Sequence, residues 1–95
     1  MQHYHDYIVT NPTKTVLYIG VTNNLASRMA QHFANRGQPE TFAGRFFCFN
    51  LVYWETYPRI KEAIAREKEL KGWSRAKKEA LIATTNPTWD FVNLG

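Results

Sequence analysis

The pattern of apolar and polar positions along the chain predicts three strands. Residues 4–10 and 15–21 are rich in β-branched and aromatic side chains, and a turn that contains Pro12 separates them. This pattern is typical of an antiparallel hairpin. Residues 46–55 are apolar and aromatic almost throughout and predict a third strand. The three runs together predict a small three-stranded sheet, mixed or antiparallel.

The first helix is predicted directly after the hairpin. Residues 25–35 follow two asparagines that can cap a helix, and Gly37 and Pro39 are expected to end it. Residues 36–44 combine helix-breaking and polar side chains, so they are expected to form a loop.

Two further helices are predicted after the third strand. Pro58 suits the first turn of a helix, which is expected to run to residue 70 or 71 and to stop at Gly72 in the C′ position. Ser74 is expected to cap a last helix over residues 75–84. The predicted order is ββαβαα, an α+β fold in which helices flank the sheet. The chain of 95 residues has room for a single domain, 1–95.

The distribution of charge adds a candidate surface. The chain has 12 Lys+Arg, 8 Asp+Glu and a net charge of +4, and eight of the 12 basic residues lie between residues 59 and 78. A basic face favours polyanions such as DNA through phosphate contacts, although a solvated helical face gives the same pattern. Trp73, between the two basic helices, could stack on a base or lock the helices together by packing. The candidates for nucleic-acid binding are Lys68, Lys71, Arg75, Lys77 and Lys78.

Other features narrow the class of protein. Cys48 is the only cysteine, which excludes an intrachain disulfide and a cysteine-rich zinc site, and its aromatic neighbours indicate a buried, inert thiol. The amino terminus lacks the basic and apolar regions of a secretory signal. No apolar run reaches the roughly 20 residues that span a bilayer. We therefore expect a cytoplasmic protein without a membrane segment.

A carboxylate is expected on the inward face of the helix after Pro58. An apolar stripe at helical spacing shares its side with Glu67; the stripe consists of Ile60, Ala63, Ile64 and Leu70. Burying a carboxylate without a partner is costly, so a cation is expected beside it. The cation could be Arg28 or a lysine in an ion pair, or a hard divalent ion such as Mg²⁺.

Arg28 and His32 are candidate site residues on the first helix. They lie four residues apart and therefore on one side of the helix, one turn from each other. An arginine there could contact two phosphate oxygens and stabilise charge that develops in a transition state, or it could lie over the core as a surface side chain. His32 could assist proton transfer, hold a phosphate, or close the edge of the core.

Tyr7 and Tyr18 lie on the two arms of the predicted hairpin. Strand tyrosines usually pack with a satisfied hydroxyl, which is one interpretation of both. A phenol with a pKa of about 10 is a poor base at neutral pH and needs a cation nearby to act as one. Gly20, at the exit of the second arm, permits a close backbone approach or an unusual dihedral angle.

Two segments resemble the GIY-YIG nuclease superfamily. The first is residues 17–25 together with Arg28, and the second is residues 63–73, which include Glu67. Within the superfamily, the chain is similar to small stand-alone bacterial domains that are like the amino-terminal domain of the excinuclease of excision repair. The resemblance covers residues 4–89. It departs from the family pattern at its first motif, where His5-Asp6-Tyr7 stands in place of Gly-Ile-Tyr. Asp6 is expected to be exposed or to contact a cation.

The resemblance implies roles for five residues. Glu67 matches the metal-binding glutamate of the family and Arg28 its catalytic arginine. Tyr7 and Tyr18 match tyrosines that line the site, one of which orients or activates the attacking water; we assign this role to Tyr18. His32 is included among the catalytic candidates because it lies beside Arg28 on the helix, and not through the resemblance. Asn86 is a candidate for an asparagine that the family often has late in the chain, although ending a helix explains it as well.

The resemblance also implies an activity. We expect a metal-dependent enzyme that hydrolyses phosphodiester bonds in DNA with one Mg²⁺ or Mn²⁺ ion. Branched or damaged DNA, met in repair or recombination, is the expected substrate, and a protein partner is expected to supply specificity. The alternative is a module that keeps the nuclease fold and binds nucleic acid or recruits a partner without catalysis.

Overall fold

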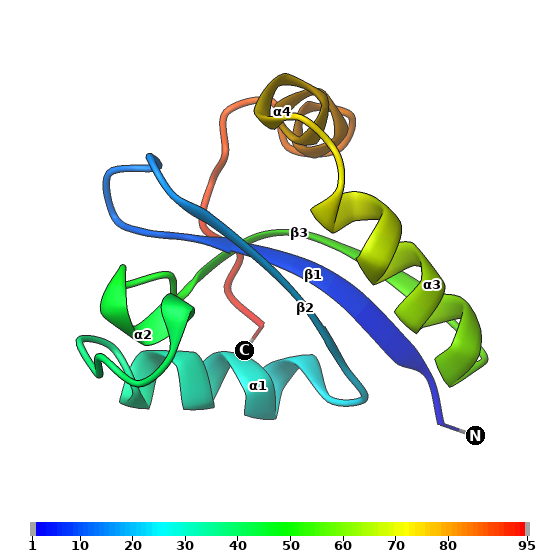
Figure 1. Ribbon diagram of the computed structural model, residues 1–95, viewed down its shortest axis with the longest axis horizontal. Coiled ribbons are helices and arrows are strands. Elements are labelled where there is room, and N and C mark those ends of the chain that lie inside the picture. The colour runs from blue at the N-terminus through cyan, green and yellow to red at the C-terminus, as the bar shows by residue number, and fades with distance from the viewer. Residues whose placement is uncertain (1, 95) are drawn as a thin grey trace.

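The computed structural model describes residues 2–94. Three antiparallel strands form one sheet in the order β2-β1-β3, so the first strand is central. Helices α1 and α2 lie on one side of the sheet, and α3 and α4 lie on the other (Figure 1). The predicted α+β fold is confirmed. The elements are β1 (Tyr4–Thr10), β2 (Leu17–Thr22), α1 (Leu25–Ala34), α2 (Phe42–Arg45), β3 (Asn50–Tyr57), α3 (Ile60–Lys71) and α4 (Arg75–Ala83).

The segment between α1 and β3 differs from the prediction. A short helix, α2, forms where a loop was expected, because the Thr41 hydroxyl caps it by accepting a hydrogen bond from the Gly44 amide at 3.0 Å. Strand β3 begins at Asn50 and not at residue 46. The reason is that Phe47 has a φ of 58°, a left-handed conformation that a strand does not contain.

The predicted caps are confirmed in two helices and corrected in a third. The side chains of Asn24 and Ser74 each accept a hydrogen bond from the third amide of the following helix. Gly72 is not a left-handed C′ residue, since its φ is −82°. The end of α3 instead tightens into a right-handed turn in which the Trp73 amide donates to the Leu70 carbonyl. Pro58 precedes the helix.

Strand β1 presents alternate side chains to two separate cores. Tyr7 and Val9 face α1 and α2, and Ile8 faces α3 and α4. The pairing of β1 with β3 shifts between Ile8 and Val9, which partner Tyr53 and Leu51. The residue left between them, Val52, therefore forms a bulge, and it packs in the same core as Tyr53.

Helix α3 covers the sheet along a narrower stripe than predicted. Ala63 and Leu70 are fully buried, but Ile60 and Ile64 are exposed. The methyl side chain of Ala63 lets the helix approach the sheet along the line from Ala63 to Leu70, which leaves the two isoleucines at its flank. Their assignment to the core was wrong.

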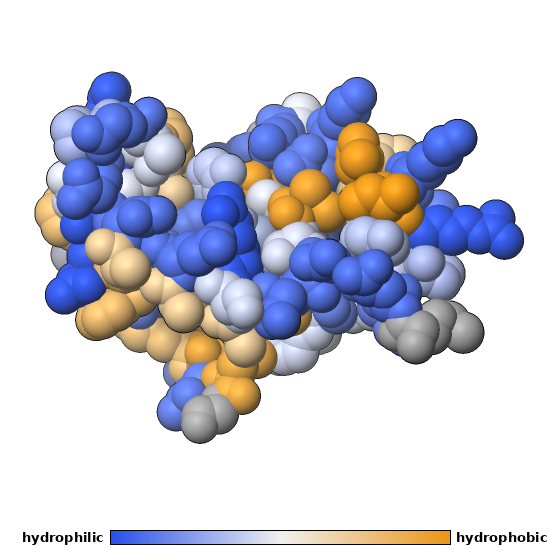
Figure 2. All heavy atoms as spheres, turned by 90° about the horizontal axis from the view of Figure 1, so that it is seen from below, coloured by the Kyte–Doolittle hydropathy of each residue, from blue (hydrophilic) through white to orange (hydrophobic). Residues whose placement is uncertain are grey.

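Several large apolar side chains lie on the surface instead of in either core. Four of them are phenylalanines at the end of α1 and around α2: Phe33, Phe42, Phe46 and Phe47. Seen from the α1 side, apolar and hydrophilic side chains are interspersed on this face (Figure 2). Cys48, in contrast, is buried as predicted, and burial raises the pKa of its thiol to about 11.

Candidate active site

Tyr7 is fully buried and its phenol crosses the backbone of β2 at Gly20. The two residues are direct partners in the β1–β2 pairing. A Cβ atom at position 20 would lie 2.4 Å from the Tyr7 Oη atom and 2.6 Å from its Cζ atom. Of the two predicted reasons for this glycine, the close approach therefore applies. Only a residue without a side chain leaves the phenol room to reach α1.

The Tyr7 hydroxyl joins the two candidate residues of α1. The Arg28 Nε–H donates to the Tyr7 Oη atom at 2.9 Å, and the His32 Nε2 atom lies 2.8 Å from the same oxygen. Residues from the central strand and the first helix therefore meet at one oxygen atom, which is buried.

The protonation states of this cluster follow from burial. Burial raises the pKa of Tyr7 to about 12, so the phenol keeps its proton at neutral pH. Burial, and then the charge of Arg28, lower the pKa of His32 to about 4, so the imidazole is neutral. Because Arg28 already donates to the Tyr7 oxygen, the phenol's own proton needs an acceptor. The neutral His32 Nε2 atom provides it, which leaves the imidazole proton on Nδ1.

Arg28 is fixed in place from two directions. Besides its bond to Tyr7, its Nη1 atom donates to the Gln31 Oε1 atom at 2.9 Å. Burial alone would lower the pKa of Arg28, but the bond to Tyr7 and the nearby phenols outweigh this effect and raise it. The guanidinium is therefore a permanent, oriented positive charge.

Tyr18 lies beside this cluster and helps to enclose a small cavity. Its ring centroid is 5.6 Å from that of His32 and 6.5 Å from that of Tyr7. Tyr18, Arg28 and His32 line a cavity of about 100 Å³, together with residues of the α1–α2 segment that include Phe42. A cavity of this size can hold a few water molecules.

Glu67 is connected to this region through a lysine. Its side chain is 17% exposed, and its Oε2 atom lies 3.5 Å from the Lys71 Nζ atom. The same Nζ atom is 6.0 Å from the centre of the Tyr18 ring. Of the cations expected beside Glu67, the structure places a lysine there and not Arg28. Lys71 thus links the acid of α3 with the phenol of β2.

Asp6, the residue before Tyr7 on β1, is a carboxylate inside the fold. It is fully buried, so the expectation of an exposed side chain was wrong. Neither of its oxygen atoms has a hydrogen-bond partner within residues 2–94. Burial, followed by the negative charges of Glu55 and Glu67, raises its pKa to about 7, against a smaller lowering by Arg66. The position of Asp6 inside a run of β-branched and aromatic residues was the sequence signal for its burial.

A network around Glu55 was not found from the sequence. The Arg66 Nε and Nη2 atoms donate to the two carboxylate oxygens of Glu55 at 2.9 and 3.0 Å. The hydroxyls of Tyr53 and Tyr57 donate to the same carboxylate. Burial opposes this charge, but the hydrogen bonds from Arg66 and the tyrosines outweigh it and lower the pKa of Glu55. Arg66 is thus committed to a structural ion pair.

Three of the five predicted nucleic-acid-binding residues contact other groups of the protein. Arg75 is held by Glu79 at 2.8 Å and by the Thr15 carbonyl at 2.9 Å, so it ties α4 to the hairpin turn. Lys77 lies over Trp73, with its Nζ atom 4.3 Å from the ring centre. Trp73 packs against the core on the α3–α4 side, as in the packing interpretation. Lys71 is paired with Glu67, and the remaining two are Lys68 and Lys78.

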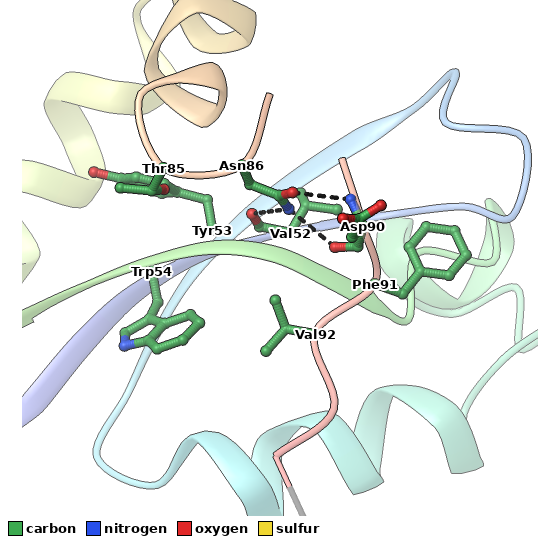
Figure 3. A pocket seen from close by; sticks show the side chains of 8 residues that line it. All are labelled: Val52, Tyr53, Trp54, Thr85, Asn86, Asp90, Phe91 and Val92. Carbon is green, nitrogen blue, oxygen red and sulfur yellow. Dashed lines mark hydrogen bonds between the residues drawn. The ribbon is translucent and has the colours of Figure 1, made fainter. Parts of the chain in front are cut away.

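Asn86 is occupied elsewhere in the fold. Its Nδ2 atom donates to the Val52 carbonyl at 3.0 Å and to the Asp90 carbonyl at 2.9 Å, and its Oδ1 atom accepts from the Asp90 amide (Figure 3). It lines a pocket of about 480 Å³ between β3 and the carboxy-terminal segment. The structure does not bring Asn86 together with Tyr18 and Arg28, and its contacts give it a structural role.

The donors available for a metal ion fit one ion class. Within residues 2–94, no three His, Cys, Asp or Glu side chains are grouped as a metal site, so a zinc-type cage does not fit. Mg²⁺ keeps several waters and needs only one or two carboxylates besides substrate phosphate. Glu67, whose ion pair with Lys71 is long at 3.5 Å, fits such an ion.

Comparison with known proteins identifies the family. The family model described as the GIY-YIG catalytic domain matches residues 3–80. The chain therefore belongs to the GIY-YIG family, and this membership implies a nuclease-type function.

The most similar relatives include members of the UPF0213 group. A UPF0213 protein of Natronomonas pharaonis is 39% identical over 79 residues, covering 83% of this chain and 91% of the relative. A UPF0213 protein of Bacillus pumilus is 33% identical over 81 residues, covering 85% and 81%. The solution NMR structure of a UPF0213 protein from Bacillus halodurans has a TM-score of 0.56 and 32% identity, and the match covers 94% of this chain and 90% of that one. Between residues 2 and 94, no helix is long and apolar enough to cross a membrane.

Proposed function

We propose that the protein is a DNA endonuclease that hydrolyses phosphodiester bonds with one Mg²⁺ or Mn²⁺ ion. The observation that carries this proposal is the meeting of Tyr7, Arg28 and His32 at one buried oxygen atom, beside a cavity that Tyr18 lines. Branched or damaged DNA is the proposed substrate, in repair or recombination, with a protein partner that supplies specificity.

Arg28 is the proposed phosphate-binding group. Its guanidinium lines the cavity and is held by Tyr7 and Gln31. A charge fixed in this way needs no reorientation when negative charge grows on the phosphate oxygens, which is the condition for strong transition-state stabilisation.

The two tyrosines have different proposed roles. Tyr7 is buried, has a pKa of about 12 and uses its hydroxyl for Arg28 and His32, so it acts as a positioning residue and not as a base. Tyr18 is half-buried and lines the cavity, where its hydroxyl can orient the attacking water. Neutral His32 accepts a hydrogen bond from the Tyr7 hydroxyl and holds the phenol in its orientation.

Glu67 is the proposed metal-holding residue. When bound, a divalent ion supplies Lewis-acid polarisation of the phosphate and stabilises the leaving oxygen. Before that, Lys71 neutralises the Glu67 carboxylate at 3.5 Å and can move away to contact a DNA phosphate. Lys68 on α3 and Lys78 on α4 are the other proposed phosphate contacts.

The test is divalent-dependent cleavage of flapped, branched and single-stranded DNA by purified protein. The wild type and the control Glu62→Gln, an exposed acid of the same helix, are expected to cleave. Glu67→Gln is expected to lose activity by about 100-fold or more, the scale of a lost transition-state contact. Equal cleavage by Glu67→Gln and the wild type would contradict the proposal. Salt-sensitive DNA binding without cleavage under either metal would instead support a non-catalytic module.

A further inference from the structure

A row of aromatic rings leads from the candidate site to the surface. The Tyr18 and Phe42 rings are stacked, with centroids 6.3 Å apart and planes inclined by 26°. The Phe42 and Phe46 rings follow with centroids 4.8 Å apart. Phe42 is 50% exposed and Phe46 40%. Phe42 therefore belongs both to the wall of the site cavity and to the outer surface.

Helix α2 holds these rings outward because its small residues face inward. Ala43 and Gly44 are buried, whereas Phe42 before them and Phe46 two residues after them are exposed. A Cβ atom at position 44 would lie 2.5 Å from the Gln38 carbonyl oxygen and 2.8 Å from that of Asn35. This close packing fixes α2 against the end of α1. An ordinary amphipathic segment buries its large apolar side chains, so the reversed arrangement points to a ligand.

The charge around the rings suits a polyanion. Arg28 lies in the cavity next to Phe42. Arg36 covers the exposed Phe33 ring, with its Cζ atom 3.8 Å from the ring centre, and Arg45 lies on α2 itself. Glu40 is the single acid between residues 33 and 47. Exposed aromatic rings with arginines between them are the usual composition of surfaces that bind single-stranded nucleic acids.

We propose that Phe42 and Phe46 form a stacking platform for unpaired bases next to the phosphate held by Arg28. This inference rests on the proposed function and adds to it a preference for DNA with a single-stranded flank. Stacking on a phenylalanine ring does not depend on the identity of the base. The platform therefore selects strandedness and not sequence. Its continuity with the cavity through Phe42 places the flank directly beside the cleaved bond.

The platform is tested by binding without catalysis. The Glu67→Gln protein, without metal, is titrated against a duplex with an unpaired flank that carries 2-aminopurine, whose fluorescence falls when it stacks. Phe42→Leu, added to this protein, keeps the apolar bulk and removes the ring. It is expected to weaken binding about tenfold and to abolish the quenching. Binding to the same duplex with a blunt end is expected to change less than about twofold.

Matched variants separate the ring from general effects. Phe42→Tyr is expected to restore affinity and quenching, because it restores a ring. Phe91→Leu removes a phenylalanine of similar exposure, 44%, whose ring lies under the Lys14 Nζ atom and does not line the site cavity, and it is expected to have no effect. Circular dichroism checks that each variant is folded.

The outcomes separate this inference from the proposed function. Equal affinity and quenching in Phe42→Leu and its parent, or an equal loss on blunt duplex, would overturn the platform, and so would a failure of all oligonucleotides to bind. Capture of a protein partner through Phe42 without any effect on DNA would do the same. If the wild type cleaves but the platform fails, only this inference falls. If quenching is found but cleavage is not, only the nuclease proposal falls.

Discussion

Two neighbouring residues of β1, Asp6 and Tyr7, show how differently the two faces of the sheet treat a buried polar group. Tyr7, on the α1 face, has its hydroxyl bonded to Arg28 and His32. Asp6, one residue earlier and on the α3 face, has no hydrogen-bond partner in the described part of the chain. Satisfied buried groups make a rigid site, while an unsatisfied one lowers stability. The comparison shows that the fully hydrogen-bonded polar cluster lies on the α1 face.

The largest expected effect on DNA cleavage comes from removing Arg28, the cation of the hydrogen-bonded cluster on the α1 face. Arg28→Ala is expected to reduce cleavage by about 10²–10³-fold, because it removes the fixed charge from the cavity. Gln31→Ala, which removes only the outer support of the same guanidinium, is expected to reduce cleavage far less. Cleavage rates at saturating metal measure both. Similar losses in the two variants would show that Arg28 acts through the fold and not at the phosphate.

Gly20→Ala is expected to displace the Tyr7 phenol and to destabilise the protein by about 1–3 kcal/mol, the cost of an overpacked core. Tyr7→Leu removes the Oη, Cζ and Cε2 atoms that the new Cβ would meet at 2.4, 2.6 and 2.8 Å, so the double variant is expected to lose less than the sum of both changes. Gly72→Ala, where the nearest atom is 3.5 Å away, is the control. Urea denaturation measures the free energies of unfolding, and simple additivity would contradict the close approach.

Asp6→Val removes the unpaired carboxyl group on the α3 face and tests its effect on stability. Because the folded pKa of Asp6, about 7, lies above its ordinary value of 3.8, the folded state binds the extra proton. Stability is therefore expected to fall as the pH rises from about 4 to about 7. The valine variant is expected to be more stable than the wild type by on the order of 2 kcal/mol at pH 8, and by less at pH 5.

Urea denaturation of both proteins at the two pH values measures this difference. A stability difference that does not change with pH would contradict the assignment of the raised pKa to Asp6.

His32 is expected to make the stability depend on pH in the opposite direction from Asp6 and by a smaller amount, which His32→Gln tests. The folded pKa of His32, about 4, lies below its ordinary value of 6.5, so the unfolded state binds more protons between these values. The stability that His32 provides is then fully present above about pH 6.5 and is lost as the pH falls toward 4. Thermal denaturation between pH 4 and 7 measures it, and the glutamine variant is expected to lose about 1 kcal/mol less than the wild type over this range.

Much of the fold was predictable because local signals agreed with the global structure. The hairpin, the caps at Asn24 and Ser74 and the order of strands and helices follow from β-branched runs and capping side chains. Helix α2 was missed because its stability comes from close packing at Gly44 against residues of the preceding turn. Such a contact leaves no periodic pattern in four residues.

The candidate site was predictable in its members but not in its bonds. Tyr7, Arg28 and His32 were expected near one another, but the phenol that joins them depends on the space above Gly20. The ion pair of Glu67 with Lys71 is local, at a spacing of four residues, and could have been predicted. The Glu55–Arg66 contact depends on how α3 packs against β3 and could not.

The binding position of a paramagnetic ion tests directly whether α3, β2 and α1 contribute to one metal site. Mn²⁺ is added to ¹⁵N-labelled protein, and line broadening is mapped by NMR, since residues near the ion lose their signals. Broadening is expected at Glu67, Tyr18 and Arg28 together, and it is expected to be lost in Glu67→Gln and kept in Glu62→Gln. Broadening that is centred elsewhere, or that survives in Glu67→Gln, would contradict a single site shared by α3, β2 and α1.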